Sequence, residues 1–371
     1  MTDSLHDLVP QCIRELSPYL PGKPVEEVER ELRIHAIKLA SNENPLGPSP
    51  LAMEAVRHAL KDANRYPDGG GFYLREKLAG KHGVSPDAIF LGEGSSELID
   101  LVARILLRPG DEGLAGEVTF PLYWIAIRAA GARLVRVPMK NWAFDLEALT
   151  RGITPNTRVI YLANPNNPTG AIFTQQEFDA FYRRVTDASP ALIVLDEAYV
   201  DFVQTPGFPN AMELAGRAPN LLVLRTFSKS HGLAGMRIGY GVGPAELFVE
   251  MNKLRTPFNT SGVAQAAAMA ALDDAEHVRR SRELVHYGMS QLRAGLDSLG
   301  VRYAESQANF LFLELGRSGN EVASALLRLG VIVRPMDWMG APNAIRVSVG
   351  TREENAKFLA ALAQVQAVPA K

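Results

Sequence analysis

The sequence predicts an α/β fold, in which a mostly parallel, seven-stranded sheet with flanking helices is followed by a smaller α+β domain. Two observations predict it. Seven short apolar runs of strand length alternate with helical patterns, and such alternation is typical of parallel strands covered by helices. The chain also has 371 residues, which exceeds the size at which a single hydrophobic core stops growing, so we expect two domains.

The predicted elements follow one another along the chain. The seven strand-like runs cover residues 88–91, 113–115, 133–137, 158–162, 191–195, 221–224 and 238–242. After Pro257 a long helical pattern covers 275–299, and further strand-like runs follow at 310–313, 331–334 and 345–349. We therefore expect three parts: an N-terminal arm over 1–45, interrupted by several prolines, a large domain over 46–260, and a small C-terminal domain over 261–371.

Composition excludes several classes of protein. A net charge of −2 without a basic run argues against nucleic acid or an anionic membrane as the main partner. No apolar stretch approaches the roughly 18 residues of a membrane helix, and the acidic N-terminus lacks the apolar region of a secretory signal. Cys12 is the single cysteine, so no intramolecular disulfide or structural zinc site is expected. These features predict a cytoplasmic protein without a metal.

The segment from 226 to 237 combines a lysine amine, hydroxyls and a guanidinium just beyond an apolar run. A lysine forms a Schiff base with a carbonyl only after it loses a proton, and hydroxyls with Arg237 are suited to hold a phosphate beside it. Lys229 is therefore a candidate for binding a phosphorylated aldehyde. Taken alone, a lysine in a polar loop is also typical of a solvated surface position.

A second apolar run ends in Asp196 and is followed shortly by Tyr199. Ligands of open α/β sheets bind beyond the carboxyl ends of the strands, so an acid at this place points into the crevice. A carboxylate against a pyridine nitrogen keeps it protonated, which makes the ring an electron acceptor, and Tyr199 is then placed to hydrogen-bond a phenolic oxygen on that ring. An N-cap or turn residue is the alternative explanation for such an acid.

Two more loops follow strand-like runs. The loop 164–170 contains two X-Pro steps and a glycine, which fix a rigid turn that can present the Asn167 amide inward. Gly94, Ser95 and Ser96 precede an amphipathic pattern, and free amides at a helix N-terminus favour a phosphate. Serine is equally a good N-cap, and the first loop is also typical of an ordinary turn. Neither loop matches a P-loop or a dinucleotide fingerprint.

These four segments, each placed after a predicted strand, together resemble the fold type I pyridoxal-phosphate aminotransferases over nearly the whole chain. The resemblance implies Lys229 as the lysine that binds pyridoxal 5'-phosphate, Asp196 on the pyridine nitrogen, and Tyr199 with Asn167 on the phenolic oxygen. It further implies a phosphate-binding group formed by Gly94, Ser95, Ser96, Ser228 and Arg237. Tyr123 matches the aromatic residue that stacks on the cofactor ring, although without this context it reads as a core tyrosine.

Within this superfamily the chain more closely resembles the histidinol-phosphate aminotransferases, through residues 16–24, 39–48, 65–68 and 344–350. The resemblance implies a homodimer in which Tyr66 reaches the partner's cofactor phosphate. It also implies that Arg346 binds the α-carboxylate of the amino-acid partner, that Tyr19 and Asn44 lie near the substrate, and that the arm closes the site. Without the family, Arg346 is equally typical of a surface or ion-paired arginine.

The implied reaction is transamination of L-histidinol phosphate with a 2-oxo acid, 2-oxoglutarate, which gives imidazole acetol phosphate and glutamate in histidine biosynthesis. Lys229 would release the cofactor to the incoming amine and then remove its Cα proton. Phe258 stands where a tyrosine hydroxyl would suit a substrate phosphate, so an aromatic amino-acid aminotransferase is an alternative. A phospho-amino-acid decarboxylase is a further one. A cofactor-binding regulator is disfavoured, because 371 residues leave no room for an added DNA-binding domain.

Overall fold

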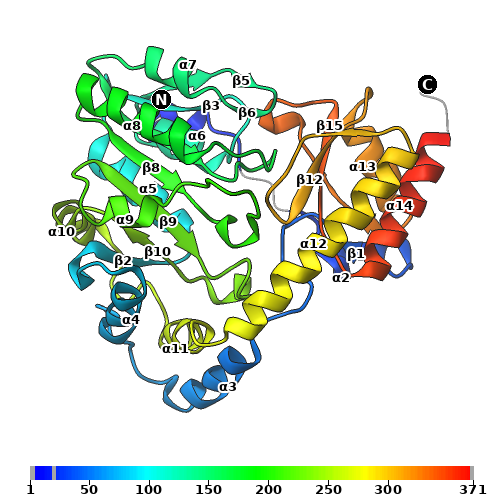
Figure 1. Cartoon of the computed structure of the whole chain (residues 1–371), viewed down its shortest axis with the longest axis horizontal. Coiled ribbons are helices and arrows are strands. Elements are labelled where there is room, and N and C mark those ends of the chain that lie inside the picture. Colours follow the sequence, from blue (N-terminus) through cyan, green and yellow to red (C-terminus); the bar gives the residue numbers. More distant parts are fainter. Residues whose placement is uncertain (1–4, 19–21, 368–371) are drawn as a thin grey trace.

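The computed structural model describes residues 5–18 and 22–367. Figure 1 shows a larger α/β domain beside a smaller domain, with the long helix α12 (Ala275–Ser298) running from one to the other. None of the helices in the described ranges has the length and hydropathy of a bilayer-spanning segment.

The large domain is built on a seven-stranded sheet. From edge to edge its strands are β2 (Ile89–Gly92), β10 (Gly239–Val242), β9 (Leu221–Thr226), β8 (Leu192–Asp196), β7 (Thr157–Ala163), β3 (Glu112–Gly116) and β4 (Arg133–Val137). β10 runs antiparallel to both of its neighbours, and the remaining pairs are parallel. The prediction of a mostly parallel seven-stranded sheet is confirmed, and each predicted run lies within two residues of a strand.

The helices of this part of the chain lie around the sheet (Figure 1). They are α3 (Pro50–Ala59), α4 (Phe72–His82), α5 (Ser95–Leu106), α6 (Leu122–Ala129), α7 (Leu146–Arg151), α8 (Gln175–Ala188), α9 (Ala211–Ala215), α10 (Ala245–Leu254) and α11 (Gly262–Ala271). Helix α8 begins with a capping box, in which the Thr174 hydroxyl accepts a hydrogen bond from the Glu177 amide and the Glu177 carboxylate accepts one from the Thr174 amide. Its start is therefore encoded locally.

The small domain has a four-stranded antiparallel sheet and three helices. The strands, in order, are β11 (Arg302–Tyr303), β12 (Phe310–Glu314), β15 (Ala344–Ser348) and β14 (Arg334–Pro335). The helices are α12, α13 (Gly319–Arg328) and α14 (Arg352–Ala367). Leu292, Phe310 and Phe358 are fully buried between them. This domain has its own core, as a smaller α+β unit requires.

Short elements complete the fold. The hairpin β5 (Met139–Lys140) and β6 (Ala143–Phe144) follows β4, and six 3₁₀ turns are described: η1 (Leu5–Leu8), η2 (Leu60–Asp62), η3 (Pro86–Ala88), η4 (Val200–Phe202), η5 (Ala234–Met236) and η6 (Asp337–Met339). In the N-terminal arm lie α1 (Gln11–Arg14), α2 (Val25–Leu32) and β1 (Ile37–Lys38), and β1 pairs in parallel with β13 (Val331–Ile332) of the small domain. The arm from α2 onward thus lies against the small domain.

The packing suggests a different domain boundary from the one expected at residue 260. The buried alanines of α11, among them Ala264 and Ala268, belong to the same apolar cluster as the large-domain sheet, whereas α12 contributes Leu292 and Leu296 to the small-domain cluster. We therefore propose that the large domain extends through α11 and that the small domain starts at α12. The sequence suggested an earlier boundary because the chain becomes helix-rich before it leaves the first core.

Candidate active site

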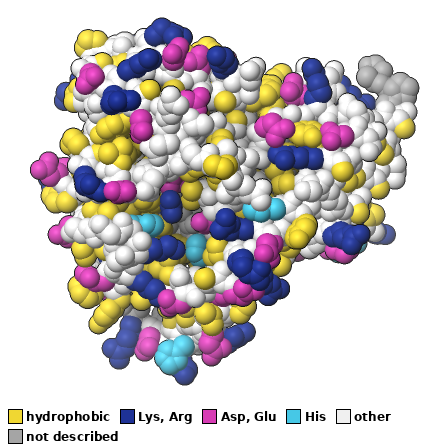
Figure 2. Space-filling view, viewed as in Figure 1, with side chains coloured by type: hydrophobic (Ala, Val, Ile, Leu, Met, Phe, Trp, Pro, Cys, Tyr) yellow, Lys and Arg dark blue, Asp and Glu magenta, His cyan; other side chains and the backbone are white. Residues whose placement is uncertain are grey.

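The carboxyl ends of the parallel strands meet strands of the small domain at one cavity of about 270 Å³. In the space-filling view, basic side chains gather around the middle of this face, between the two domains (Figure 2). The cavity is lined by Gly22, Ala40, Ser41, Asn42, Glu43, Ser95, Ser96, Phe120, Tyr123, Ala163, Pro165, Asn167, Asp196, Ala198, Tyr199, Thr226, Ser228, Lys229, Ala234, Arg237, Arg334 and Arg346. Ten predicted site residues are in this set, so segments far apart in sequence converge as expected.

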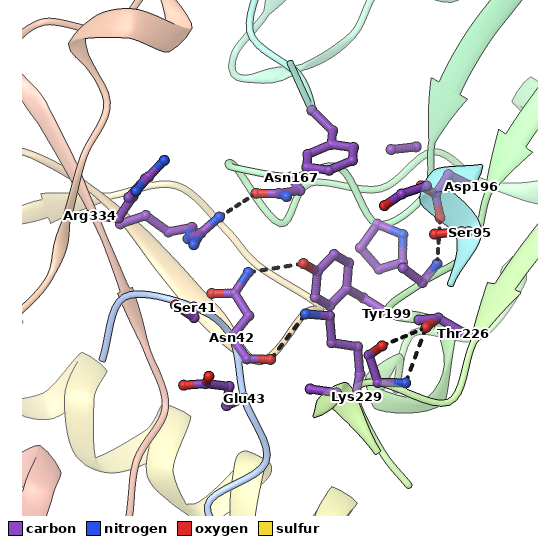
Figure 3. Close-up of a pocket in the computed structure, with 18 of the residues that line it drawn as sticks. Ser41, Asn42, Glu43, Ser95, Asn167, Asp196, Tyr199, Thr226, Lys229 and Arg334 are labelled. Carbon is purple, nitrogen blue, oxygen red and sulfur yellow. Dashed lines mark hydrogen bonds between the residues drawn. The ribbon is translucent and has the colours of Figure 1, made fainter. Parts of the chain in front are cut away.

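Lys229 lies just beyond the end of β9, and its side chain points into the cavity (Figure 3). Its Nζ donates a hydrogen bond of 3.3 Å to the backbone carbonyl of Asn42. The same nitrogen lies 5.4 Å from the centre of the Tyr199 ring. The amine is thus held by the N-terminal arm on one side and by an aromatic ring on the other.

Asp196 is the last residue of the buried strand β8 and is only 5 % exposed. Its Oδ2 accepts a 3.0 Å hydrogen bond from the Tyr123 hydroxyl, and its Oδ1 accepts one of 3.0 Å from the Ala198 amide. Burial raises the pKa of this carboxyl to about 6 in spite of these two donors. A buried carboxylate of this kind is stabilised by a cation, which a protonated pyridine nitrogen provides.

Tyr199 and Asn167, predicted to contact the phenolic oxygen of such a ring, both line the cavity. The Tyr199 hydroxyl accepts a 3.0 Å hydrogen bond from the Asn42 side-chain amide, and burial raises its pKa, so it is protonated at neutral pH. Asn167 accepts a 2.6 Å hydrogen bond from Arg346, which is itself bound to the Ala40 carbonyl at 2.6 Å. Arg346 therefore links the loop 164–170 to the arm.

The predicted phosphate-binding group surrounds the N-terminus of α5. No side chain caps this helix at Gly94, so its first amides are suited to an anion. The Arg237 guanidinium closes over the same place, with donors to the Ala234 carbonyl at 2.9 Å and to Ser228 Oγ at 3.5 Å. A Cβ built on Gly94, whose φ is +72°, would lie 2.5 Å from the Arg237 guanidinium. The close approach of backbone and guanidinium requires glycine here.

These donors fit pyridoxal 5'-phosphate. An uncapped helix N-terminus with a guanidinium suits the phosphate, the buried Asp196 suits the ring nitrogen, and Lys229 lines the same cavity. Tyr123 lines the cavity too, but its ring is fully buried, stacks on Tyr161 with centroids 5.1 Å apart and donates its hydroxyl to Asp196. The stacking of Tyr123 on a cofactor ring remains a prediction. Its hydrogen bond to Asp196 was not predicted from the sequence.

Asn44 and Tyr66, both predicted site residues, lie away from the cavity. Tyr19 is outside the described residues. The side-chain amide of Asn44 donates to the backbone carbonyls of Lys229 and Ser230, at 3.2 and 3.0 Å, so it holds the lysine segment from behind instead of lining the cavity. Tyr66 is 83 % exposed and stacks on Phe258, away from the cavity of its own protomer. Gly94 does not line the cavity either, but it directly precedes Ser95 and Ser96, which do.

Sequence reasoning missed Asn42 and Arg334. Asn42 has a φ of +53°, which asparagine tolerates better than most residues, and it contacts both Tyr199 and Lys229. The Ser-Asn-Glu-Asn stretch at 41–44 contained it, but no local pattern distinguished it from Asn44. Arg334 ends a strand-like run and is only 7 % exposed, with its guanidinium 4.9 Å from the Trp338 ring. A buried arginine can be recognised only once the domains are in place.

The fold and the site define an aminotransferase, and comparison with known proteins agrees. The family model for aminotransferase class I and II matches residues 34–362. Histidinol-phosphate aminotransferase 2 of Pseudomonas fluorescens is 46% identical over 358 residues, covering 96% of either chain. The histidinol-phosphate aminotransferase of Moorella thermoacetica is 45% identical over 365 residues, 97% of this chain and 94% of the other.

A solved structure of histidinol-phosphate aminotransferase from Sinorhizobium meliloti, in complex with pyridoxal-5'-phosphate, superposes with a TM-score of 0.87 at 29% identity, covering 96% of this chain and 97% of that one. Aspartate aminotransferase from Thermus thermophilus with maleate gives 0.85 at 25% identity, covering 96% and 99%. The chain therefore belongs to the aminotransferase class I and II family and, within it, to the histidinol-phosphate aminotransferases.

Proposed function

We propose that the protein transaminates L-histidinol phosphate with 2-oxoglutarate, using pyridoxal 5'-phosphate. Family membership supports the reaction. The single structural observation that carries it is the meeting of Lys229, the buried Asp196 and two buried arginines, Arg334 and Arg346, in one cavity. The substrates carry a phosphate or carboxylates, and guanidinium groups bind both kinds of anion.

When bound, pyridoxal 5'-phosphate supplies an aldehyde that condenses with amines and a pyridine ring that accepts the electrons of a carbanion. Lys229 would hold the cofactor through its aldehyde carbon, and its Nζ, once an amino donor has taken its place there, would accept the donor's Cα proton. The Asp196 carboxylate holds a proton on the ring nitrogen. Tyr199 and Asn167 orient the ring by its phenolic oxygen.

The anion contacts divide between the two domains. Ser95, Ser96, Ser228 and Arg237, beside Gly94 on the large domain, bind the cofactor phosphate. Arg346, on strand β15 of the small domain, binds the α-carboxylate of glutamate or 2-oxoglutarate. Arg334, on the neighbouring strand β14, offers a second guanidinium for the substrate's distal anion. In this proposal the large domain binds the cofactor phosphate, and the small domain binds the anionic groups of the substrates.

Purified enzyme is expected to show a kcat/KM for histidinol phosphate at least about 100-fold above that for phenylalanine. Only histidinol phosphate carries a phosphate that can pair with a buried arginine of the cavity. Steady-state assays with 2-oxoglutarate as acceptor measure both values. A preference for phenylalanine would instead support the aromatic aminotransferase. Product formation without 2-oxoglutarate, accompanied by CO₂ release, would indicate the decarboxylase.

We further propose that two copies of the chain form a homodimer in which Tyr66 binds the cofactor phosphate of the partner. Aromatic side chains are exposed on this part of the protomer: Tyr66 (83 %), Phe72 (58 %), Tyr73 (74 %) and Phe258 (44 %). Exposed aromatic residues in such number favour an interface. Tyr66 and Phe258 stack with ring centroids 4.6 Å apart, which orients the tyrosine outward.

A cytoplasmic location is also proposed, since a single cysteine is usual for a reducing compartment.

Replacing Tyr66 with alanine is expected to weaken cofactor binding by about 10–100-fold, because a hydrogen bond to a charged group is lost. Equilibrium dialysis of the cofactor measures the change. At a cofactor concentration too low to load Tyr66→Ala, mixing its dimers with inactive Lys229→Ala dimers so that subunits exchange should restore activity, up to about one quarter of the wild-type value, because half of the mixed population keeps one intact site. An active monomer in light scattering, or no restoration on mixing, would contradict the cross-subunit role.

A further inference from the structure

A group of polar and charged side chains lies directly behind Asp196 and Lys229, and none of its members lines the cavity. The group consists of Glu197, Asp201, Arg225, Ser230 and His231. Glu197, Ser230 and His231 are at most 8 % exposed, and the reaction proposed above uses none of the five. Buried polar groups of this kind are costly unless they are paired, so their arrangement calls for a physical role.

The first contact joins the strand that carries the acid to the strand that leads to the lysine. Arg225, on β9, donates from Nε and from one terminal nitrogen to Glu197 Oε2, at 2.9 and 2.7 Å. The Glu197 side chain is fully buried, and its amide donates to the Leu224 carbonyl at 2.9 Å. Glu197 immediately follows Asp196, so this ion pair fixes the end of β8 to β9.

The second contact joins the segment that carries Lys229 to the turn that follows β8. The Ser230 hydroxyl donates to Asp201, in the turn η4 that follows Tyr199, and also contacts His231 Nδ1 at 3.1 Å. Burial alone would raise the pKa of Asp201, but His231, the Ser230 hydroxyl and Arg225 together hold it below its usual value, so this carboxyl is ionised. Ser230 immediately follows Lys229, so this bond fixes the lysine segment to the turn after β8.

The two contacts share one pattern. In the first contact, the carboxylate of Glu197, the residue after Asp196, binds the strand that leads to Lys229. In the second, the hydroxyl of Ser230, the residue after Lys229, binds a carboxylate in the turn that follows β8. Side chains from neighbouring elements complete the surroundings: His82 of α4 contacts the Tyr240 hydroxyl of β10 at 2.9 Å, and Tyr240 packs on Phe227 with ring centroids 5.8 Å apart. The carboxyl end of β8 and the loop after β9 are therefore tied twice, on the side away from the cavity.

We propose that the Arg225–Glu197 and Ser230–Asp201 contacts are a positioning device that sets Lys229 and Asp196 in register across the cofactor ring. The inference deepens the proposed function and rests on it. Lys229 must reach the aldehyde carbon while Asp196 meets the ring nitrogen at the opposite end, so an error in their separation affects binding and proton transfer together. Misplacement of a reacting group by about 1 Å costs about 100-fold in rate.

Ser230→Ala and Asp201→Ala test the second contact, alone and combined. Each is expected to weaken cofactor affinity by about 10-fold and to lower kcat by about 10–100-fold with little change in KM. The double variant should lose no more than either single one, because both remove the same bond. Asp201→Asn keeps an acceptor for the Ser230 hydroxyl and should recover most of the loss. Absorbance of the lysine–cofactor adduct, followed during cofactor titration, gives a readout besides activity.

A matched control lies at the opposite end of the sheet. There Thr154 donates at 2.8 Å to Glu112, a buried carboxylate that is also paired with Arg133. Thr154→Ala removes a comparable hydroxyl–carboxylate bond far from the cavity and should lower the melting temperature without changing cofactor affinity. If the Ser230 and Asp201 variants behave like this control, the positioning role is overturned. If the wild-type protein itself fails to bind the cofactor, the proposed function fails instead.

Discussion

Replacing Lys229 with alanine is expected to lower transamination by at least about 10⁴-fold, since it removes the covalent attachment of the cofactor and the group that moves the Cα proton, and proton transfer alone contributes about 10²–10⁴-fold. Among the described residues that line the cavity, the other basic groups are arginines, which do not deprotonate in proteins and so do not replace the amine. Steady-state kinetics and the visible absorbance of the cofactor-loaded protein measure both losses.

The control for this variant is Lys253→Ala, which removes a lysine paired on the surface with Glu250. It should leave the rate and the absorbance unchanged. Near-normal transamination by Lys229→Ala would contradict the assignment of the lysine. Retained cofactor absorbance after extensive dialysis would contradict the covalent attachment.

Asp196→Asn is expected to have opposite effects on activity and on stability. Activity should fall by about 10²–10³-fold in kcat, the usual loss when one preorganised electrostatic contact to the reacting system is removed. The amide keeps acceptor and donor atoms for Ala198 and Tyr123, so the local fold is retained. Stopped-flow absorbance separates this loss in the chemical steps from any loss in cofactor binding.

The cofactor-free protein should instead become more stable. Burial raises the pKa of Asp196 to about 6 from its usual 3.8, a difference worth up to about 3 kcal/mol. Because the folded-state pKa is the higher one, ionised Asp196 destabilises the fold at pH values above about 6, and the penalty disappears as the pH falls toward 4. Asp196→Asn escapes the penalty, so its free energy of unfolding should exceed that of the wild type at pH 8.

Urea unfolding of the cofactor-free proteins at pH 8 and pH 5 measures this difference. The gap between variant and wild type should shrink at the lower pH. An equal gap at both values would show that Asp196 does not titrate in this range. Adding the cofactor at pH 8 should stabilise the wild type more than the variant, because only the carboxylate pairs with a protonated ring.

Much of the fold could be predicted because its signals are local. The apolar residues of the runs that become β7, β8 and β9 are buried, and a run of this kind needs only its own residues to be recognised. The convergence of Lys229 and Asp196 also followed from general topology, because carboxyl ends of neighbouring parallel strands lie at the same edge of a sheet. The loop containing Asn167 follows from the same rule.

Other features depended on contacts between distant segments. The proposed assignment of α11 to the large domain depends on alanine packing against α3 and α4, which its helical pattern does not encode. Asn44 has the residue type of a substrate ligand, yet its amide is used on the backbone behind Lys229. Tyr123 has the residue type of a stacking ring, yet its hydroxyl meets Asp196. For Asn44 and Tyr123 the residue type permits several roles, and these hydrogen bonds could be identified only in the packed structure.

The chemistry of this protein could thus be predicted from short stretches of sequence, since an amine, a carboxylate and phosphate-binding amides are defined by the residues at the ends of the strands. The reach of Asn42 to Tyr199 and Lys229, the burial of Arg334 and Arg346, and the two contacts behind the cavity arise only when the arm, the sheet and the small domain pack together. Distances and desolvation are properties of that assembly, and they determine how a side chain ionises and what it can bind.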